Sequence, residues 1–124
     1  MKRIINTDKA PKAVGPYSQA VEANGTLYVS GQLPIDPETG KTPETIEEQT
    51  EQALKNTGAI LEAAGYSYAD VVKSTVLLNS MDDFAAMNGV YAKFYTQDMP
   101  ARVAYQVAKL PFGVKVEIET IAAR

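Results

Sequence analysis

The sequence predicts one α+β domain spanning residues 1–124, in which two helices cover one face of a β-sheet. A chain of 124 residues is long enough for one hydrophobic core and too short for two. Apolar residues recur at helical spacing in two segments, and segments with strand-like composition lie before, between and after them. Helices separated by a single strand, beside an antiparallel hairpin, are typical of the α+β class.

The hairpin is expected near the N-terminus. Asn24-Gly25 favours a tight turn, and it separates two candidate strands at 18–23 and 26–31. The following segment, 34–40, contains two prolines and a glycine. Because these residues interrupt regular structure, the segment is expected to form a loop.

The first helix is expected to begin after Thr45 and to end before Gly65. Thr45 and Glu48 have the spacing of a capping box, which satisfies the first free amides of a helix. A glycine suits the position that follows a helix. Residues of the inward face then recur at helical spacing: Ile46, Ala53, Leu54, Thr57, Ile60, Leu61 and Ala64.

The second half of the chain is expected to contain three strands and one helix. The segment 71–78 is rich in β-branched and aliphatic residues, which predicts a buried strand. The polar segment 80–83 is expected to cap a second helix that runs to about Tyr95. Two further strands, 101–107 and 115–122, are expected to form a pair. The inward face of the second helix is predicted to contain Phe84, Met87, Tyr91 and Phe94.

Two helices cover only one face of such a sheet, so its second face needs a partner. Strand residues whose alternation assigns them to that second face are too apolar for open solvent. An exposed apolar surface of this kind indicates an interface between copies of the chain. The residues expected there are Leu33, Val72, Val76 and Ile118.

Composition restricts the chemistry that is available. The chain has no Cys and no His, which excludes disulfides, thiolate nucleophiles, zinc–thiolate sites and a Ser-His-Asp triad. A net charge of -3 argues against binding to nucleic acid or to an anionic membrane. No apolar stretch approaches the ~20 residues of a membrane span, and no signal-peptide pattern follows the basic first residues. A cytoplasmic protein is therefore expected.

Two of the predicted strands carry candidate site residues. Alternation places Arg102 and Ala104 on one face of their strand. An arginine beside a small residue can bind a carboxylate with its two-pronged guanidinium, although the spacing alone favours a surface arginine. Glu117 can activate water if it lies in a desolvated cleft. The alternative, which the pattern favours, is a charged outer face that it shares with Glu119.

Three other places have polar groups near apolar ones. Asn88 lies near the apolar face of the second helix, where it is either a site residue or a loop cap. The segments 15–19 and 29–32 supply hydroxyl groups and glycines that allow close approach of a ligand. Neither segment matches a phosphate-binding loop.

At these residues the chain resembles the YjgF/RidA family of reactive-intermediate deaminases, over essentially its whole length. The resemblance implies a mixed sheet with two helices on one side, as in the bacillus-type chorismate mutase fold. It also implies a barrel-like homotrimer with clefts at the subunit boundaries. The matching segments are 15–20, 28–34, 71–76, Pro100-Ala101-Arg102, Leu110-Pro111 and 116–119.

The implied activity is hydrolysis of 2-enamine and 2-imine acids, such as 2-aminoacrylate and 2-aminocrotonate, to 2-keto acids without metal or cofactor. Arg102 would hold the substrate carboxylate with help from the backbone amide of Ala104, and Glu117 would hold and polarise the attacking water. The cleft would be lined by Tyr17, Ser30, Gly31 and Asn88.

The chain departs from the family pattern beside Arg102. Val103 stands where the family usually has Ser, Tyr105-Gln106 where it often has Val-Glu, and Ala104 where some members have Cys. These differences leave Arg102 and Glu117 in place, but bulkier walls can change the substrate preference. Two other functions remain: a non-enzymatic trimeric protein that binds small metabolites or acts like a chaperone, and a nuclease or translation inhibitor. The acidic composition and the missing His weigh against a nuclease.

Overall fold

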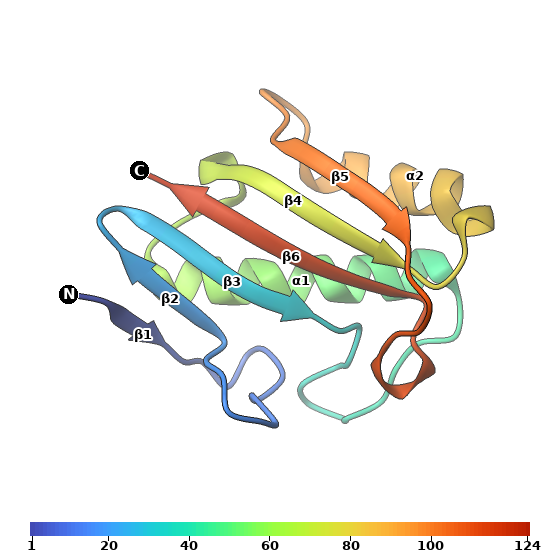
Figure 1. Cartoon of the computed structure of the whole chain (residues 1–124), viewed down its shortest axis with the longest axis horizontal. Helices are drawn as coiled ribbons and strands as arrows, with labels where there is room; N and C mark the ends of the chain where they lie inside the picture. Colours follow the sequence, from blue (N-terminus) through green and yellow to red (C-terminus); the bar gives the residue numbers. More distant parts are fainter.

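A six-stranded mixed sheet, with strand order β1-β2-β3-β6-β4-β5, forms the front layer of the computed structural model, which describes residues 1–124 (Figure 1). The strands are β1 (Arg3–Ile5), β2 (Ala20–Ala23), β3 (Thr26–Gln32), β4 (Val71–Leu78), β5 (Ala101–Gln106) and β6 (Val116–Ala123). Helices α1 (Ile46–Ala64) and α2 (Phe84–Phe94) lie together behind the sheet, which confirms the predicted α+β class. Neither helix is long and apolar enough to cross a membrane.

The N-terminal hairpin forms where it was predicted. Asn24 and Gly25 have φ values of 51° and 76°, as a two-residue hairpin turn requires, and β2 pairs with β3 antiparallel. Strand β2 begins at Ala20, later than predicted. The side chain of the preceding Gln19 holds the N-terminal loop. Its Oε1 accepts a hydrogen bond from the Thr7 amide at 2.7 Å. The short edge strand β1 was not predicted.

Helix α1 has the predicted ends. The Thr45 hydroxyl oxygen accepts a hydrogen bond from the Glu48 amide at 3.1 Å, and the Glu48 carboxylate accepts one from the Thr45 hydroxyl at 3.0 Å. Gly65 ends the helix in the left-handed region, with φ 83°. Glu48 thus closes the cap through the hydroxyl group of Thr45, whereas a standard capping box uses the backbone amide.

The predicted pairing of the last two strands is wrong. Strand β4 has the predicted bounds, but it lies between β5 and β6, parallel to β5 and antiparallel to β6. The chain leaves β4 through α2 and returns beside it, and such a crossover produces a parallel neighbour. The predicted second helix follows residues 80–83 and ends at Phe94, close to the predicted end near Tyr95. A 3-10 turn, η2 (Met81–Asp83), is capped by Ser80, and α2 begins at Phe84.

The predicted assignment of Val76 and Ile118 to the uncovered face is wrong as well. These two residues are neighbours in the β4–β6 register, and both are fully buried in the core beneath the helices. Alternation shows that residues share a face, but it does not show which face the helices cover. Val72 is exposed at an irregular step of the β4–β6 register, and Leu33 lies beyond the end of β3.

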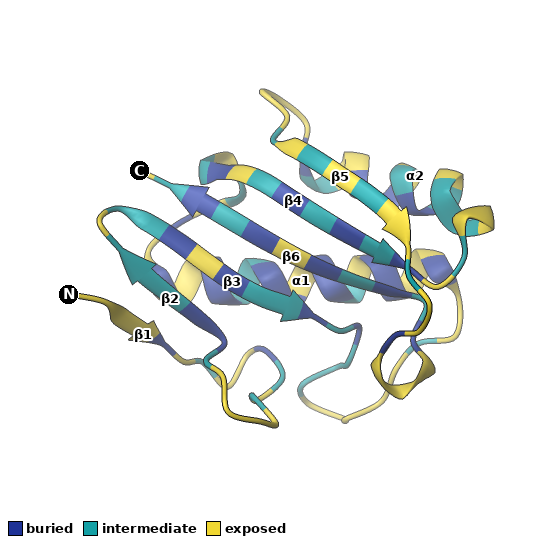
Figure 2. Ribbon diagram, in the orientation of Figure 1, coloured by how far each residue is buried: buried dark blue, intermediate teal, exposed yellow.

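The uncovered face, called the open face below, is nevertheless partly apolar. Its exposed side chains include Tyr28, Val103 and Tyr105, which are 51%, 44% and 47% exposed. Figure 2 shows dark blue bands alternating with exposed or half-buried residues along β4 and β6, and mostly exposed residues along β5. Large apolar side chains are therefore exposed on the face that the helices leave uncovered.

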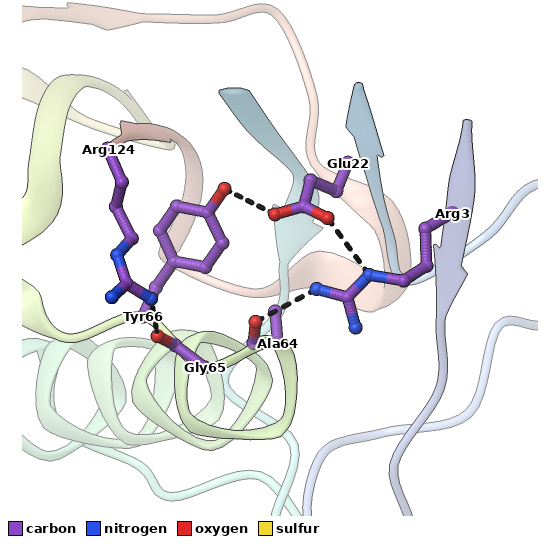
Figure 3. Close-up of polar contacts among 6 residues, drawn as sticks. All are labelled: Arg3, Glu22, Ala64, Gly65, Tyr66 and Arg124. Carbon is purple, nitrogen blue, oxygen red and sulfur yellow. Dashed lines mark hydrogen bonds and ion pairs between the residues drawn. The ribbon is translucent and has the colours of Figure 1, made fainter. Parts of the chain in front are cut away.

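Both ends of the chain are attached to the C-terminal end of α1 (Figure 3). The Glu22 carboxylate accepts a hydrogen bond from Arg3 Nε at 2.9 Å and another from the Tyr66 hydroxyl at 2.5 Å. Arg3 and Arg124 also donate to carbonyl oxygens at the end of α1. Cations stabilise this end of a helix, because its free carbonyl groups give it a partial negative charge.

Candidate functional site

Arg102 lies on the edge strand β5, on the helix-covered side of the sheet. Its register neighbour on β4, Ser74, is fully buried. The guanidinium Nη1 donates to Asn88 Oδ1 at 2.7 Å, and its central carbon lies 4.9 Å from the Tyr91 ring centroid and 5.6 Å from that of Phe84. The ion pairs of the chain involve other residues, so Arg102 has no counter-ion. It is a partly buried cation, held in one orientation and free to bind an anion.

The backbone beside Arg102 offers another donor. The Val107 amide donates to the Leu78 carbonyl on β4 at 2.9 Å. Amide directions alternate along a strand, so the Ala104 amide points away from β4, toward the free edge of the sheet. A cavity of about 320 Å³ lies along this edge, lined by Asn88, Tyr91, Ala92, Tyr95, Met99, Pro100 and Arg102. The Arg102 guanidinium lines this cavity, where its charge and N–H groups suit a carboxylate.

Glu117 lies on the open face of β6. Its register neighbour on β4 is Leu77, which is itself beside Tyr105 of β5. The Glu117 side chain is half-buried and forms no hydrogen bond or ion pair within the chain. Burial raises the pKa of the Glu117 carboxyl, and the negative charge of Glu119 raises it further. A carboxylate in this condition accepts a proton more readily than an ordinary glutamate.

Gly31 lies directly against this carboxylate. A Cβ atom added to Gly31 would be 2.0 Å from Glu117 Oε2, so the carboxylate occupies the space that any other side chain would fill. The β3–β6 register shifts between Val29 and Gln32, which leaves Ser30 and Gly31 outside the regular ladder. The sequence predicted close approach of a ligand to this glycine, and the group that lies against Gly31 in the structure is the Glu117 side chain.

Two further predicted residues lie beside Gly31. The Ser30 hydroxyl donates to the Ser18 carbonyl at 2.6 Å, which leaves its oxygen free to accept. The Tyr17 ring is half exposed, and its hydroxyl accepts a long hydrogen bond from the Val14 amide at 3.4 Å. Tyr17 and Gly31 line one cavity of about 240 Å³. The structure therefore brings Tyr17, Ser30, Gly31 and Glu117 together.

The predicted residues form two separate groups. The arginine half-site contains Asn88, Arg102 and Ala104, and the glutamate half-site contains Tyr17, Ser30, Gly31 and Glu117. Along β4, the neighbours of Arg102 and Glu117 are Ser74 and Leu77, and the two side chains point to opposite faces. Strand geometry puts their backbones ~10 Å apart along the sheet and two strand spacings of ~4.8 Å apart across it. No small ligand contacts both side chains within one chain.

Sequence reasoning missed the two aromatic rings beside Arg102. Phe84 and Tyr91 were predicted as core residues, yet each also packs near the guanidinium. Phe84, Asn88 and Tyr91 are spaced by four and three positions, so they share one face of α2. The signal available in the sequence for this part of the site was an amide side chain, Asn88, between two aromatic residues on one helix face. No three His, Cys, Asp or Glu side chains gather as ligands for a metal ion.

The family model described as Endoribonuclease L-PSP matches residues 7–124. The 2-iminobutanoate/2-iminopropanoate deaminase of Mus musculus is 50% identical, over 100% of this chain and 93% of the mouse protein. The crystal structure of RidA from an Antarctic Psychrobacter is 51% identical, with a TM-score of 0.96 over 98% of this chain and 99% of that one. Escherichia coli TdcF with bound serine is 43% identical, with a TM-score of 0.96 over 98% of both chains.

Proposed function

We infer that this chain, which belongs to the Endoribonuclease L-PSP family (also called YjgF/RidA), hydrolyses 2-imino acids to 2-keto acids and ammonia. Relatives named as imine deaminases, about half identical over the full chain, support an imine deaminase function. The observation that carries the proposal is the state of Arg102. It is partly buried and oriented, and it has no anion of its own.

Arg102 binds the substrate carboxylate. Asn88 uses one N–H of the guanidinium, and the rings of Tyr91 and Phe84 lie close to its central carbon. The remaining N–H groups can form paired hydrogen bonds with a carboxylate. The outward amide of Ala104 donates to the same carboxylate. Serine, the ligand in the TdcF structure, is a small amino acid with a carboxylate, and it agrees with small carboxylic acids as the class of ligand.

Glu117 positions and activates the attacking water. As the water oxygen adds to the imine carbon, the Glu117 carboxylate accepts one of its protons. The protonated Glu117 returns this proton to the nitrogen, which gives a carbinolamine. Glu117 then takes the proton of the carbinolamine hydroxyl and passes it to the nitrogen, so the C–N bond breaks, ammonia leaves and the carbonyl forms. Proton transfer of this kind is most effective when the pKa of the catalytic group lies closer to the working pH. The raised pKa of Glu117 fits that requirement.

The complete site is shared between copies of the chain. Because the two half-sites lie on opposite faces of one sheet, the arginine half-site of one copy must meet the glutamate half-site of another. Contacts between unlike surfaces form closed rings when the rotation between copies permits closure. A homotrimer with the open faces inside satisfies this and covers Tyr28, Val103 and Tyr105. Light scattering after size exclusion should give three times the chain mass at micromolar concentration, and a stable monomer would contradict the shared site.

Substitution of Glu117 tests the chemistry. Glu117→Gln keeps the shape of the side chain but cannot accept a proton. Turnover of 2-aminoacrylate, generated in situ by a dehydratase, should fall by about 10²–10⁴, while calorimetry shows 2-ketobutyrate bound as well or better. Glu119→Gln makes the same charge change on the same face and should remain active. Equal losses in both variants would leave Glu117 with a structural role.

The same assay separates the enzyme from the non-enzymatic alternative. A protein that only binds small metabolites would bind 2-ketobutyrate in the calorimeter and would not accelerate release of the keto acid. A nuclease would leave the imine untouched and cleave RNA.

A further inference from the structure

The cavity beside the glutamate half-site extends well beyond it. Its volume is about 240 Å³. A methyl group is about the size of a water molecule, which occupies about 30 Å³ in the liquid, so the cavity has room for a much larger side chain. Tyr17 and Gly31 form one side, next to the Glu117 carboxylate. The loops 11–14 and 33–40 and the 3-10 turn η3 (Pro111–Gly113) form the rest. The apolar residues among these are Pro11, Val14, Leu33, Ile35, Pro37 and Phe112.

The Gln19, Gln32 and Asp36 side chains in this lining already have partners in the chain, whereas the Lys12 ammonium has none. The Gln19 side-chain amide nitrogen donates to three carbonyl oxygens of the N-terminal loop. Gln32 Nε2 donates to the Ser30 carbonyl at 3.0 Å, and Asp36 Oδ1 accepts from the Glu38 amide at 2.8 Å. Groups that are satisfied internally offer little to a polar ligand. The apolar residues of the lining are therefore the part of the cavity that suits an apolar side chain.

Phe112 lies at this cavity in an unfavourable conformation. Its φ of 57° and ψ of 16° are in the left-handed region, which bulky side chains rarely adopt. The ring is also 77% exposed, so it gains little from burial in the chain itself. Strained residues of this kind concentrate at ligand sites, where the strain maintains a required geometry. Here it holds an aromatic ring at the wall of the cavity that Tyr17 also lines.

We propose that this cavity receives the side chain of the imino acid, and that Phe112 gives the enzyme a preference for bulky apolar side chains, branched or aromatic. The proposal rests on the function proposed above. With the reacting carbon at Glu117, the substrate side chain points past Gly31, because Gly31 borders both the carboxylate and the cavity. Each buried methylene then strengthens binding about fourfold, from ~0.8 kcal/mol per group.

The test compares imines of different size. An amino-acid oxidase, with catalase present, generates the imines of alanine, leucine and phenylalanine, and semicarbazide trapping measures how fast each disappears. The wild-type chain should show kcat/KM at least tenfold higher for the leucine or phenylalanine imine than for the alanine imine. Phe112→Asn should lower that ratio at least fivefold, since Asn adopts the left-handed region but lacks the ring. Phe112→Tyr keeps the ring and should keep the ratio.

Calorimetry with the corresponding keto acids measures the cavity independently of turnover. Tighter binding of 4-methyl-2-oxopentanoate than of pyruvate, reduced in Phe112→Asn and kept in Phe112→Tyr, supports the proposal even in a preparation that turns over no imine. The absence of imine turnover in such a preparation would overturn only the proposed function. Two results would overturn the role of the cavity and leave the deaminase function intact. One is equal binding and turnover of small and bulky ligands by the wild-type chain. The other is a Phe112→Asn variant in which binding and turnover of small and bulky ligands change by the same factor.

Discussion

Replacing Gly31 with Ala tests the position of Glu117 without altering any ionisable group. The added Cβ would lie 2.0 Å from Glu117 Oε2 and 2.9 Å from its Cδ, whereas Cβ contacts under 3.0 Å essentially do not occur. The carboxylate must therefore move by at least about 1 Å. A misplacement of about 1 Å costs roughly 10²-fold in rate when the group positions the reactants. Turnover in Gly31→Ala should fall by about that factor.

The stability of the variant should change little. The obstructing atoms belong to the end of a half-buried side chain, which can rotate toward solvent. Gly31 does not have a positive φ, so Ala fits the backbone, and loss of glycine freedom in the unfolded chain favours the variant by ~0.4–1 kcal/mol. Thermal unfolding should give a Tm equal to or above that of the parent, while the imine assay shows the loss of turnover.

Gly89→Ala is the matched control. Gly89 lies on the exposed side of α2, and a Cβ added there meets nothing within 4 Å. This variant should gain helix stability, roughly 0.5–1 kcal/mol, and keep its activity. The double variant Gly31→Ala with Glu117→Gln should be little slower than Glu117→Gln alone, because both changes remove one function. Full turnover in Gly31→Ala, or additive losses in the double variant, would refute the role assigned to the carboxylate position.

Two further outcomes are expected. Arg102→Lys and Arg102→Ala should weaken 2-ketobutyrate binding tenfold to a hundredfold, since a lost charge-assisted pair is worth ~1.5–3 kcal/mol. The Tm and the oligomeric state of both variants should change little. Full activity in Arg102→Lys would make Arg102 a structural residue. Activity requires ionised Glu117, so kcat/KM should fall as the pH drops through its raised pKa. Because Glu119 contributes to that rise, Glu119→Gln should move the acid limb of the pH profile to lower pH, and an unmoved limb would assign it to another group.

Local rules were sufficient for several elements of the fold. The cap of α1 at Thr45 and its end at Gly65 depend on residues within one helical turn of each end. The turn at Asn24-Gly25 depends on two residues that adopt positive φ readily. The bounds of β4 follow from a run of β-branched and aliphatic residues. In each case the stabilising contacts lie close together in the sequence, so the sequence carries the signal directly.

Other elements depend on distant partners. Strand β1 has three residues, too few for a pattern, and exists because β2 offers it an edge. The insertion of β6 between β3 and β4 joins residues far apart in the chain. Val76 and Ile118 were assigned to the wrong face because alternation is symmetric, and only the packing of α1 and α2 distinguishes the two faces.

In the candidate site, too, the sequence determined some features and the tertiary structure determined others. By itself, the sequence determined which side chains were available, Arg102 and Glu117 among them, because the absence of His and Cys left few other groups. Only the tertiary structure decided that Arg102 faces α2, that Glu117 lies over Gly31, and that the two point to opposite sides of the sheet. The physical reason is that a strand's own sequence relates side chains along that strand, whereas relations between strands are determined by register and by long-range packing.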